Sequence, residues 1–123
     1  MGINRRMEGD ILVLENTETG ECVRVYESIV DGQARIAPEG KLTLDLVHDL
    51  EDELTSMVLM CSSVTIDLTS VQYIANSVIR MILEIQHMVD SRGGTMKICI
   101  AGEDVWSRFE EMGLEDVFDI ERV

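Results

Sequence analysis

Residues 64–100 read VTIDLTSVQYIANSVIRMILEIQHMVDSRGGTMKICI, and this stretch decides the fold. It opens with a short run rich in β-branched residues, 64–68, which predicts a buried strand. After a polar turn, apolar residues recur at helical spacing over about 76–92, and the Gly-Gly pair at 93–94 ends that helix. Residues 96–100 predict a second strand. A strand, a helix and a strand in this order predict a right-handed crossover between parallel strands.

The same alternation continues on both sides of this stretch. From Thr43, apolar residues at helical spacing predict a first helix; they are Leu46, Val47, Leu50, Leu54 and Met57. Residues 103–112 predict a shorter third helix, and the apolar segment 117–120 either adds a last strand or docks on the core. Repeated strands and helices indicate an α/β domain whose parallel central strands are covered by helices.

The first third of the chain predicts antiparallel strands instead. Residues 11–14 and 22–26 are extended patterns on either side of a polar, turn-forming segment, 16–20. Asp31-Gly32 is the strongest turn dipeptide, and alternation from Gln33 predicts a second antiparallel pairing. We therefore expect a mixed sheet with an N-terminal β hairpin, divided into an extension over 1–32 and a core over 33–120.

Composition limits the class of protein. The 123 residues are 46% apolar and 28% charged, which fits one domain without a stabilising metal or disulfide. A net charge of −14 disfavours nucleic acid and anionic membranes as partners, and a basic or apolar protein fits better. The chain has no apolar run long enough to insert into a membrane and no secretory pattern at its start, so we expect a cytoplasmic protein. Cys22, Cys61 and Cys99 are expected to be small buried residues.

Catalytic and metal sites are not expected. The sequence has no Gly-rich phosphate loop and no nucleophile elbow around a serine. Glu84 and His87 have the spacing of a di-iron ligand pair, but the second copy that such a site needs is missing. His48 shares a helix face with acids and is expected to be solvated. We therefore predict a protein that is not an enzyme and binds no cofactor or metal.

The long helix carries the candidate interaction surface. Its predicted core face consists of Val78, Met81, Ile82, Ile85 and Val89, and its far side consists of Asn76, Arg80, Leu83 and His87. Charges on this helix nearly cancel, whereas residues 103–121 carry eight acids and one base. A weakly charged face with one apolar residue is typical of a protein contact surface. The competing interpretation is that Leu83 is an ordinary exposed leucine and Asn76 an N-cap.

Four short patterns carry a family resemblance: residues 64–69, Tyr73-Ile74, 91–94 and 112–118. In this order and spacing, over about 33–120, the chain resembles the STAS domains. This family includes bacterial anti-sigma-factor antagonists and the cytoplasmic domains of sulfate transporters. The resemblance implies a STAS-like single domain that works by partner switching, in which a kinase that is also the anti-sigma factor phosphorylates a serine in an Asp-Ser-Ser-Gly pattern.

This chain departs from that pattern, because the four positions read Ala75-Asn76-Ser77-Val78. Asn76 occupies the phosphoacceptor position and is not phosphorylatable, while Ser77 is a possible alternative acceptor, with Ser70 and Thr69 as further ones. One hypothesis is a domain fixed in its binding-competent form. Another is a STAS subunit of a transporter or lipid-transport complex.

The resemblance and the residues together predict a non-catalytic interaction module in bacterial regulation. Its expected partner is an anti-sigma factor or a serine kinase. The predicted partner-binding residues are Asn76, Ser77, Arg80, Leu83 and His87.

Overall fold

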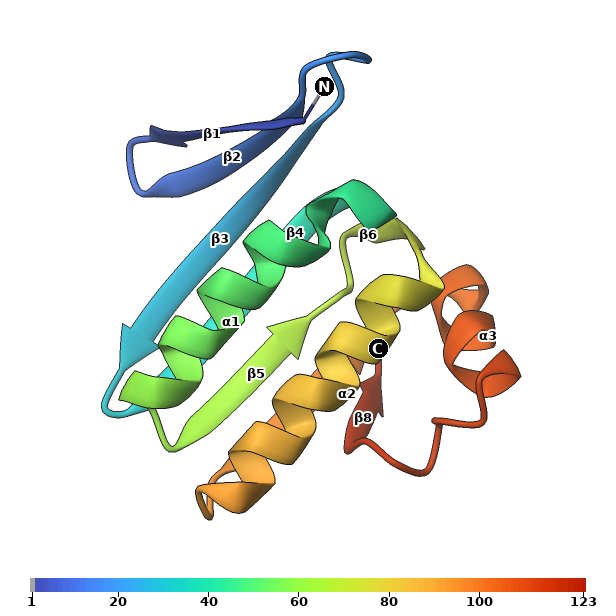
Figure 1. Ribbon diagram of the computed structural model, residues 1–123. Coiled ribbons are helices and arrows are strands. Elements are labelled where there is room, and N and C mark those ends of the chain that lie inside the picture. The colour runs from blue at the N-terminus through green and yellow to red at the C-terminus, as the bar shows by residue number, and fades with distance from the viewer. Residues whose placement is uncertain (1) are drawn as a thin grey trace.

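An eight-stranded mixed sheet forms the centre of the computed structural model, which describes residues 2–123 (Figure 1). Seven strands follow the order β1-β2-β3-β4-β5-β7-β8, and β6 pairs separately with β4. The strands are β1 (Ile3–Glu8), β2 (Ile11–Asn16), β3 (Cys22–Val30), β4 (Gln33–Leu42), β5 (Ser63–Asp67), β6 (Val71–Ile74), β7 (Thr95–Ile100) and β8 (Ile120–Arg122).

The sheet changes from antiparallel to parallel at β4. Strands β1 to β4 are joined by tight turns and pair antiparallel, while β4, β5, β7 and β8 pair parallel. Asp31 and Gly32 form the turn between β3 and β4 with positive φ angles of 53° and 76°, which suits a two-residue hairpin loop. The predicted mixed sheet with an N-terminal hairpin is therefore confirmed.

Two helices run side by side across one face of the sheet (Figure 1). A short 3-10 turn (Leu44–Leu46) leads into α1 (Val47–Met60), and α2 (Asn76–Ser91) joins β6 to β7. The shorter α3 (Glu103–Glu111) packs against β6. The buried side of α2 contains all five predicted core residues and Ile79 as well. The core is thus a sheet face under two amphipathic helices.

Two strands differ from the sequence-based prediction. Strand β1 was not expected, because most of its residues are exposed and its apolar signal is weak. The predicted polar turn before α2 contains β6, whose four residues are too few for a clear alternating pattern. At 117–120 both predicted alternatives hold in part, because Phe118 docks on the core and the last strand, over 120–122, begins at Ile120.

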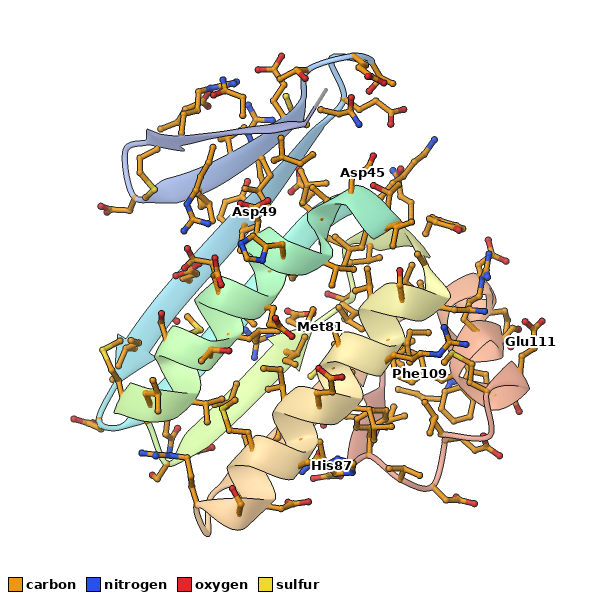
Figure 2. The ribbon with its side chains drawn as sticks, viewed as in Figure 1. Asp45, Asp49, Met81, His87, Phe109 and Glu111 are labelled. Atoms are coloured by element: carbon orange, nitrogen blue, oxygen red, sulfur yellow. The ribbon has the colours of Figure 1, made fainter. Side chains whose placement is uncertain are left out.

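The N-terminal hairpin is fastened to α1. Arg5 on β1 forms ion pairs with Asp49 and Glu53 of α1, and Asn16 at the end of β2 donates a hydrogen bond to Asp45 at 3.1 Å. Figure 2 shows Asp49 near the start of α1 and Asp45 in the 3-10 turn before it, beneath the hairpin. The hairpin and α1 therefore hold each other in place.

The cysteines only partly follow expectation. All three are free; Cys99 is buried, whereas Cys22 and Cys61 are half-buried. Within residues 2–123, no helix is both long enough and apolar enough to span a bilayer.

Candidate functional site

Asp67 builds the turn that leads into the candidate site. Its Oδ1 accepts hydrogen bonds from the backbone N–H of Thr69 at 2.9 Å and from the Thr69 hydroxyl at 2.6 Å, and its Oδ2 accepts one from Arg35 at 2.5 Å. Burial alone would raise the pKa of Asp67, but the bonds from Thr69 and Arg35 outweigh it and lower that pKa below its ordinary value. The carboxylate thus fixes the chain between β5 and β6.

Strand β6 brings the chain to the start of α2. It pairs parallel with the end of β4, so that Tyr73 lies opposite Lys41 and Ile74 opposite Leu42. The Ala75 N–H also donates to the Leu42 carbonyl at 2.9 Å. Ile74 is buried, and Tyr73 is exposed. The short strand therefore anchors Val71 and Ile74 in the core and presents an aromatic ring beside the helix start.

The predicted N-cap role of Asn76 is wrong. Ala75 is the N-cap residue, with extended backbone angles, and its carbonyl accepts hydrogen bonds from Val78 at 3.0 Å and Ile79 at 3.2 Å. Asn76 is thus the first helical residue, one position too late to cap the helix. Its Oδ1 instead accepts a hydrogen bond at 3.2 Å from Nη1 of Arg108, on α3.

Arg108 joins two features of the site. Besides bonding to Asn76, its guanidinium carbon lies 4.9 Å from the centre of the Tyr73 ring, within the range of a cation–π contact. Arg108 and Lys41 were not among the predicted site residues. The available signal was that Arg108 is the only base among the eight acids of 103–121.

The predicted face of α2 is only partly exposed. Asn76, Arg80 and His87 are exposed and Ser77 is half-buried. Leu83 is also half-buried and packs against the core, so it is a weaker apolar contact point than an exposed leucine. Figure 2 shows His87 towards the end of α2. It lies eleven positions after Asn76, which is about 16 Å along the helix. The structure thus gathers Asn76, Ser77 and Arg80 but not His87.

No group of three His, Cys, Asp or Glu side chains in the described part of the chain is arranged to hold a metal ion. His48 is exposed and lies 3.5 Å from Asp52 of the same helix. Glu84 and His87 share the exposed side of α2, and among residues 2–123 no third His, Cys, Asp or Glu joins them in a metal-binding group.

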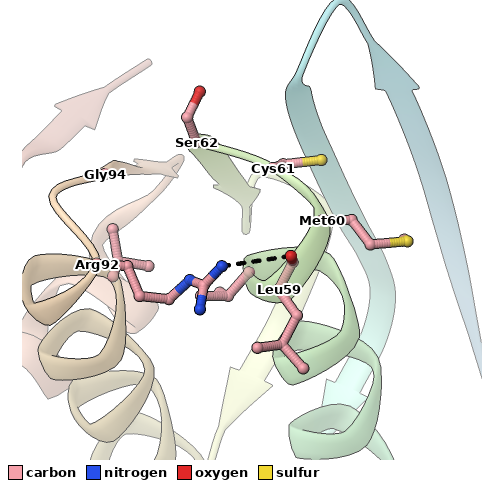
Figure 3. Close-up of a pocket in the computed structure, with 8 residues that line it drawn as sticks. Leu59, Met60, Cys61, Ser62, Arg92 and Gly94 are labelled. Atoms are coloured by element: carbon pink, nitrogen blue, oxygen red, sulfur yellow. Dashed lines mark hydrogen bonds between the residues drawn. The ribbon is translucent and has the colours of Figure 1, made fainter.

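A hollow of about 240 Å³ lies at the opposite end of the helices, where α1 and α2 finish. In Figure 3 Arg92 reaches across it, and its Nη2 donates a hydrogen bond to the Leu59 carbonyl at 3.4 Å. Cys61 and Ser62 line the same hollow. Arg92 thus ties the end of α2 to the last turn of α1, where free carbonyls favour a cation.

The comparison with protein families assigns this architecture. The model of the STAS domain matches residues 22–123. The chain belongs to the STAS domain family. The match includes the turn at Asp67, strand β6 and all three helices, and it begins at the first residue of β3.

Solved structures confirm the fold of this STAS domain. An anti-sigma factor antagonist from Mycobacterium paratuberculosis superposes with a TM-score of 0.73 at 15% identity, over 87% of this chain and 89% of that one. A putative anti-sigma factor antagonist from Thermotoga maritima gives 0.73 at 18% identity, over 80% and 86% of the two chains. The antagonist SpoIIAA in its unphosphorylated form gives 0.71 at 12% identity, over 80% and 87%.

Identities this low establish the fold and not the activity. SpoIIAA of Bacillus is also known in a phosphorylated form. A comparison with curated protein sequences returns no match. The function of this STAS domain therefore has to be argued from its own residues.

Proposed function

We propose that this STAS domain is a cytoplasmic, non-catalytic module that binds a regulatory protein through the start of α2. The observation that carries the proposal is the arrangement of Asn76. This exposed side chain accepts a hydrogen bond from Arg108, and we propose that it occupies the position that the family resemblance assigns to the phosphoacceptor serine.

The partner proposed is an anti-sigma factor or a serine kinase. The neighbour SpoIIAA, an anti-sigma factor antagonist, exists in unphosphorylated and phosphorylated forms. In this chain an asparagine at the acceptor position keeps a neutral polar side chain of similar size to serine. A phosphate there would add a charge near −2 inside the contact and oppose binding. We therefore propose that Asn76 fixes the domain in its binding-competent form.

A phosphorylatable antagonist is the second candidate, because Ser70 is exposed and Ser77 half-buried beside Asn76. Thr69 fits this role less well, since its hydroxyl already donates to Asp67 at 2.6 Å. The two candidate functions are distinguished by intact-mass measurement after the protein is incubated with a purified candidate kinase and ATP. Gain of one phosphate, abolished by Ser77→Ala or Ser70→Ala, would favour the switchable form.

Binding itself is tested with an uncharged, bulky substitution. The anti-sigma factors and serine kinases of the same genome are purified and titrated calorimetrically with the wild type, Asn76→Trp and Ser91→Trp. Ser91 is exposed at the other end of α2 and serves as the matched control. We expect one partner to bind the wild type and Ser91→Trp but not Asn76→Trp. If that partner binds all three equally, the surface is wrongly assigned. If none of these proteins binds the wild type, the regulatory role is wrong.

A further inference from the structure

The charged residues are not paired evenly over the molecule. Six of the ten Lys and Arg side chains form ion pairs with carboxylates, namely Arg5, Arg6, Arg24, Arg35, Lys97 and Arg122. Over residues 2–123, Lys41, Arg80, Arg92 and Arg108 form none. These four bases thus form no ion pair although the chain has 24 acids.

Three of these four bases belong to elements that meet near the start of α2, namely β4, α2 and α3. Lys41 is opposite Tyr73 in the pairing of β4 with β6, and Arg108 lies over the Tyr73 ring. Arg80 is exposed one helical turn after Asn76, to which Arg108 bonds. We call this group the Tyr73 patch; it consists of Lys41, Tyr73, Asn76, Arg80 and Arg108. Arg92, the fourth base, is at the far end of α2.

We propose that the partner presents a short acidic segment to the Tyr73 patch. The inference rests on the proposed function, because it specifies the partner's chemistry at that same surface. Arginine guanidinium groups bind carboxylates through paired hydrogen bonds, and the exposed Tyr73 ring offers apolar area beside Arg108. An acidic segment with interspersed small or apolar residues would satisfy both features.

The surroundings of the patch favour a short segment over a long polyanion. Asp104 and Glu111 of α3 line a hollow of about 330 Å³ beside Tyr73 and Arg108. These acids, together with the net charge of −14, repel a nucleic acid that would extend beyond the patch. At physiological ionic strength charges act over only about 8 Å, so only carboxylates that dock directly on the bases are attracted, and Asp104 and Glu111 keep the favourable segment short.

The inference is tested with two probe peptides on the isotopically labelled full chain. One is a short peptide of alternating Glu and Ser, and the other has Lys in place of Glu. We expect the Glu peptide to shift the backbone amide signals of the Tyr73 patch, and added salt to abolish these shifts. The inference is overturned if the Lys peptide shifts these signals. It is also overturned if the Glu peptide shifts only the signals of other residues, or none.

Charge reversals supply the matched comparison. Lys41→Glu, Arg80→Glu and Arg92→Glu change the net charge equally, and all three side chains are exposed and outside ion pairs. We expect the first two to weaken Glu-peptide binding about tenfold or more, and Arg92→Glu to change it less than about twofold. Equal weakening by all three would show a response to net charge alone and would contradict a local site.

The same variants separate this inference from the proposed function. Suppose that a regulatory partner does not bind Asn76→Trp but binds Lys41→Glu and Arg80→Glu as tightly as the wild type. The proposed function would then stand, and the proposal of an acidic segment would be refuted. If the Glu peptide binds the Tyr73 patch but none of the purified regulatory proteins binds the domain, only the proposed function is refuted.

Discussion

Arg108 and Asn76 are held together across the gap between α3 and α2 by a 3.2 Å hydrogen bond, from Nη1 of the arginine to Oδ1 of the asparagine. The residues are 32 positions apart in the chain. The bond therefore makes the position of one exposed amide depend on the packing of a separate helix. Because the same guanidinium lies over Tyr73, the start of α2 is a preorganised surface.

Arg108→Ala should loosen this surface while leaving the fold intact. The lost cation–π contact and exposed hydrogen bond should lower the free energy of unfolding by less than about 1 kcal/mol. Partner affinity should fall several-fold, whereas Asn76 stays exposed. Urea unfolding and calorimetric titration measure the two effects. An affinity unchanged from that of the wild type would show that Arg108 does not organise the contact.

Asn76→Asp should stabilise the protein and weaken partner binding. The new carboxylate would face Arg108 in the first turn of α2, and a negative charge at a helix start contributes typically about 0.5 kcal/mol. The same charge would mimic part of the effect of a phosphate on the partner. Thermal unfolding at neutral pH and at low salt should show the gain. Asn76→Ala is the control, and it should show no gain in stability.

Asp67→Asn should destabilise the turn that carries β6. Replacing a carboxylate that accepts three hydrogen bonds should cost about 1 to 3 kcal/mol at neutral pH. Since the folded state lowers the pKa of Asp67, its contribution is present above the unfolded pKa and is lost as the pH falls through the folded pKa. The difference between the variant and the wild type should thus shrink in acid. The exposed Asp116→Asn serves as the control in urea unfolding measured over a pH series.

Glu27→Gln should stabilise the protein at neutral pH. Burial raises the pKa of Glu27, against a smaller opposing effect of Arg5, and its Oε2 is buried without a hydrogen-bond partner among residues 2–123. The ionised form therefore costs the folded state energy at neutral pH, and this cost disappears below the unfolded pKa. We expect a gain of up to about 1 kcal/mol that vanishes in acid. If Glu27→Gln instead lowers the free energy of unfolding at neutral pH, the ionised Glu27 carboxylate is stabilised in the folded protein.

Gly94→Ala should be strongly destabilising although φ at this residue is ordinary. A Cβ there would lie 2.6 Å from the backbone carbonyl oxygen of Ser62, which cannot move aside freely. Overpacking of this kind costs about 1 to 3 kcal/mol. At the exposed neighbour Thr95, substitution by alanine should cost less than about 1 kcal/mol. If both substitutions lower the free energy of urea unfolding equally, the backbone at the start of β7 moves to accommodate the added Cβ.

Periodicity predicted the architecture well, because the core faces of α1 and α2 are continuous and amphipathic. Leu50, Leu54 and Met57 of α1 are all buried as their spacing indicates. Strands β1 and β6 escaped prediction for a common reason. One is an edge strand with a mostly polar sequence, and the other is short, so both depend on pairing with neighbours that a local pattern does not contain.

The candidate site was predictable only where it lies on one helix. Asn76 and Arg80 follow from helical projection, but Lys41 and Arg108 come from a strand and a helix on either side in sequence. Their meeting at Tyr73 is a tertiary contact. The error over the Asn76 cap has a similar origin, because pairing of β6 with β4 sets where the extended chain ends and the helix begins.

The N-terminal hairpin has a consequence for where this molecule can be divided. The family match starts at Cys22, yet Leu12 and Leu14 of β2 are buried in the same core cluster as Val25 and Val64. Trimming the chain to the matched region would bare the edge of β3 and open a void above α1, inviting association between truncated molecules. The segment that the family model matches is therefore shorter than the segment that we expect a stable preparation to need.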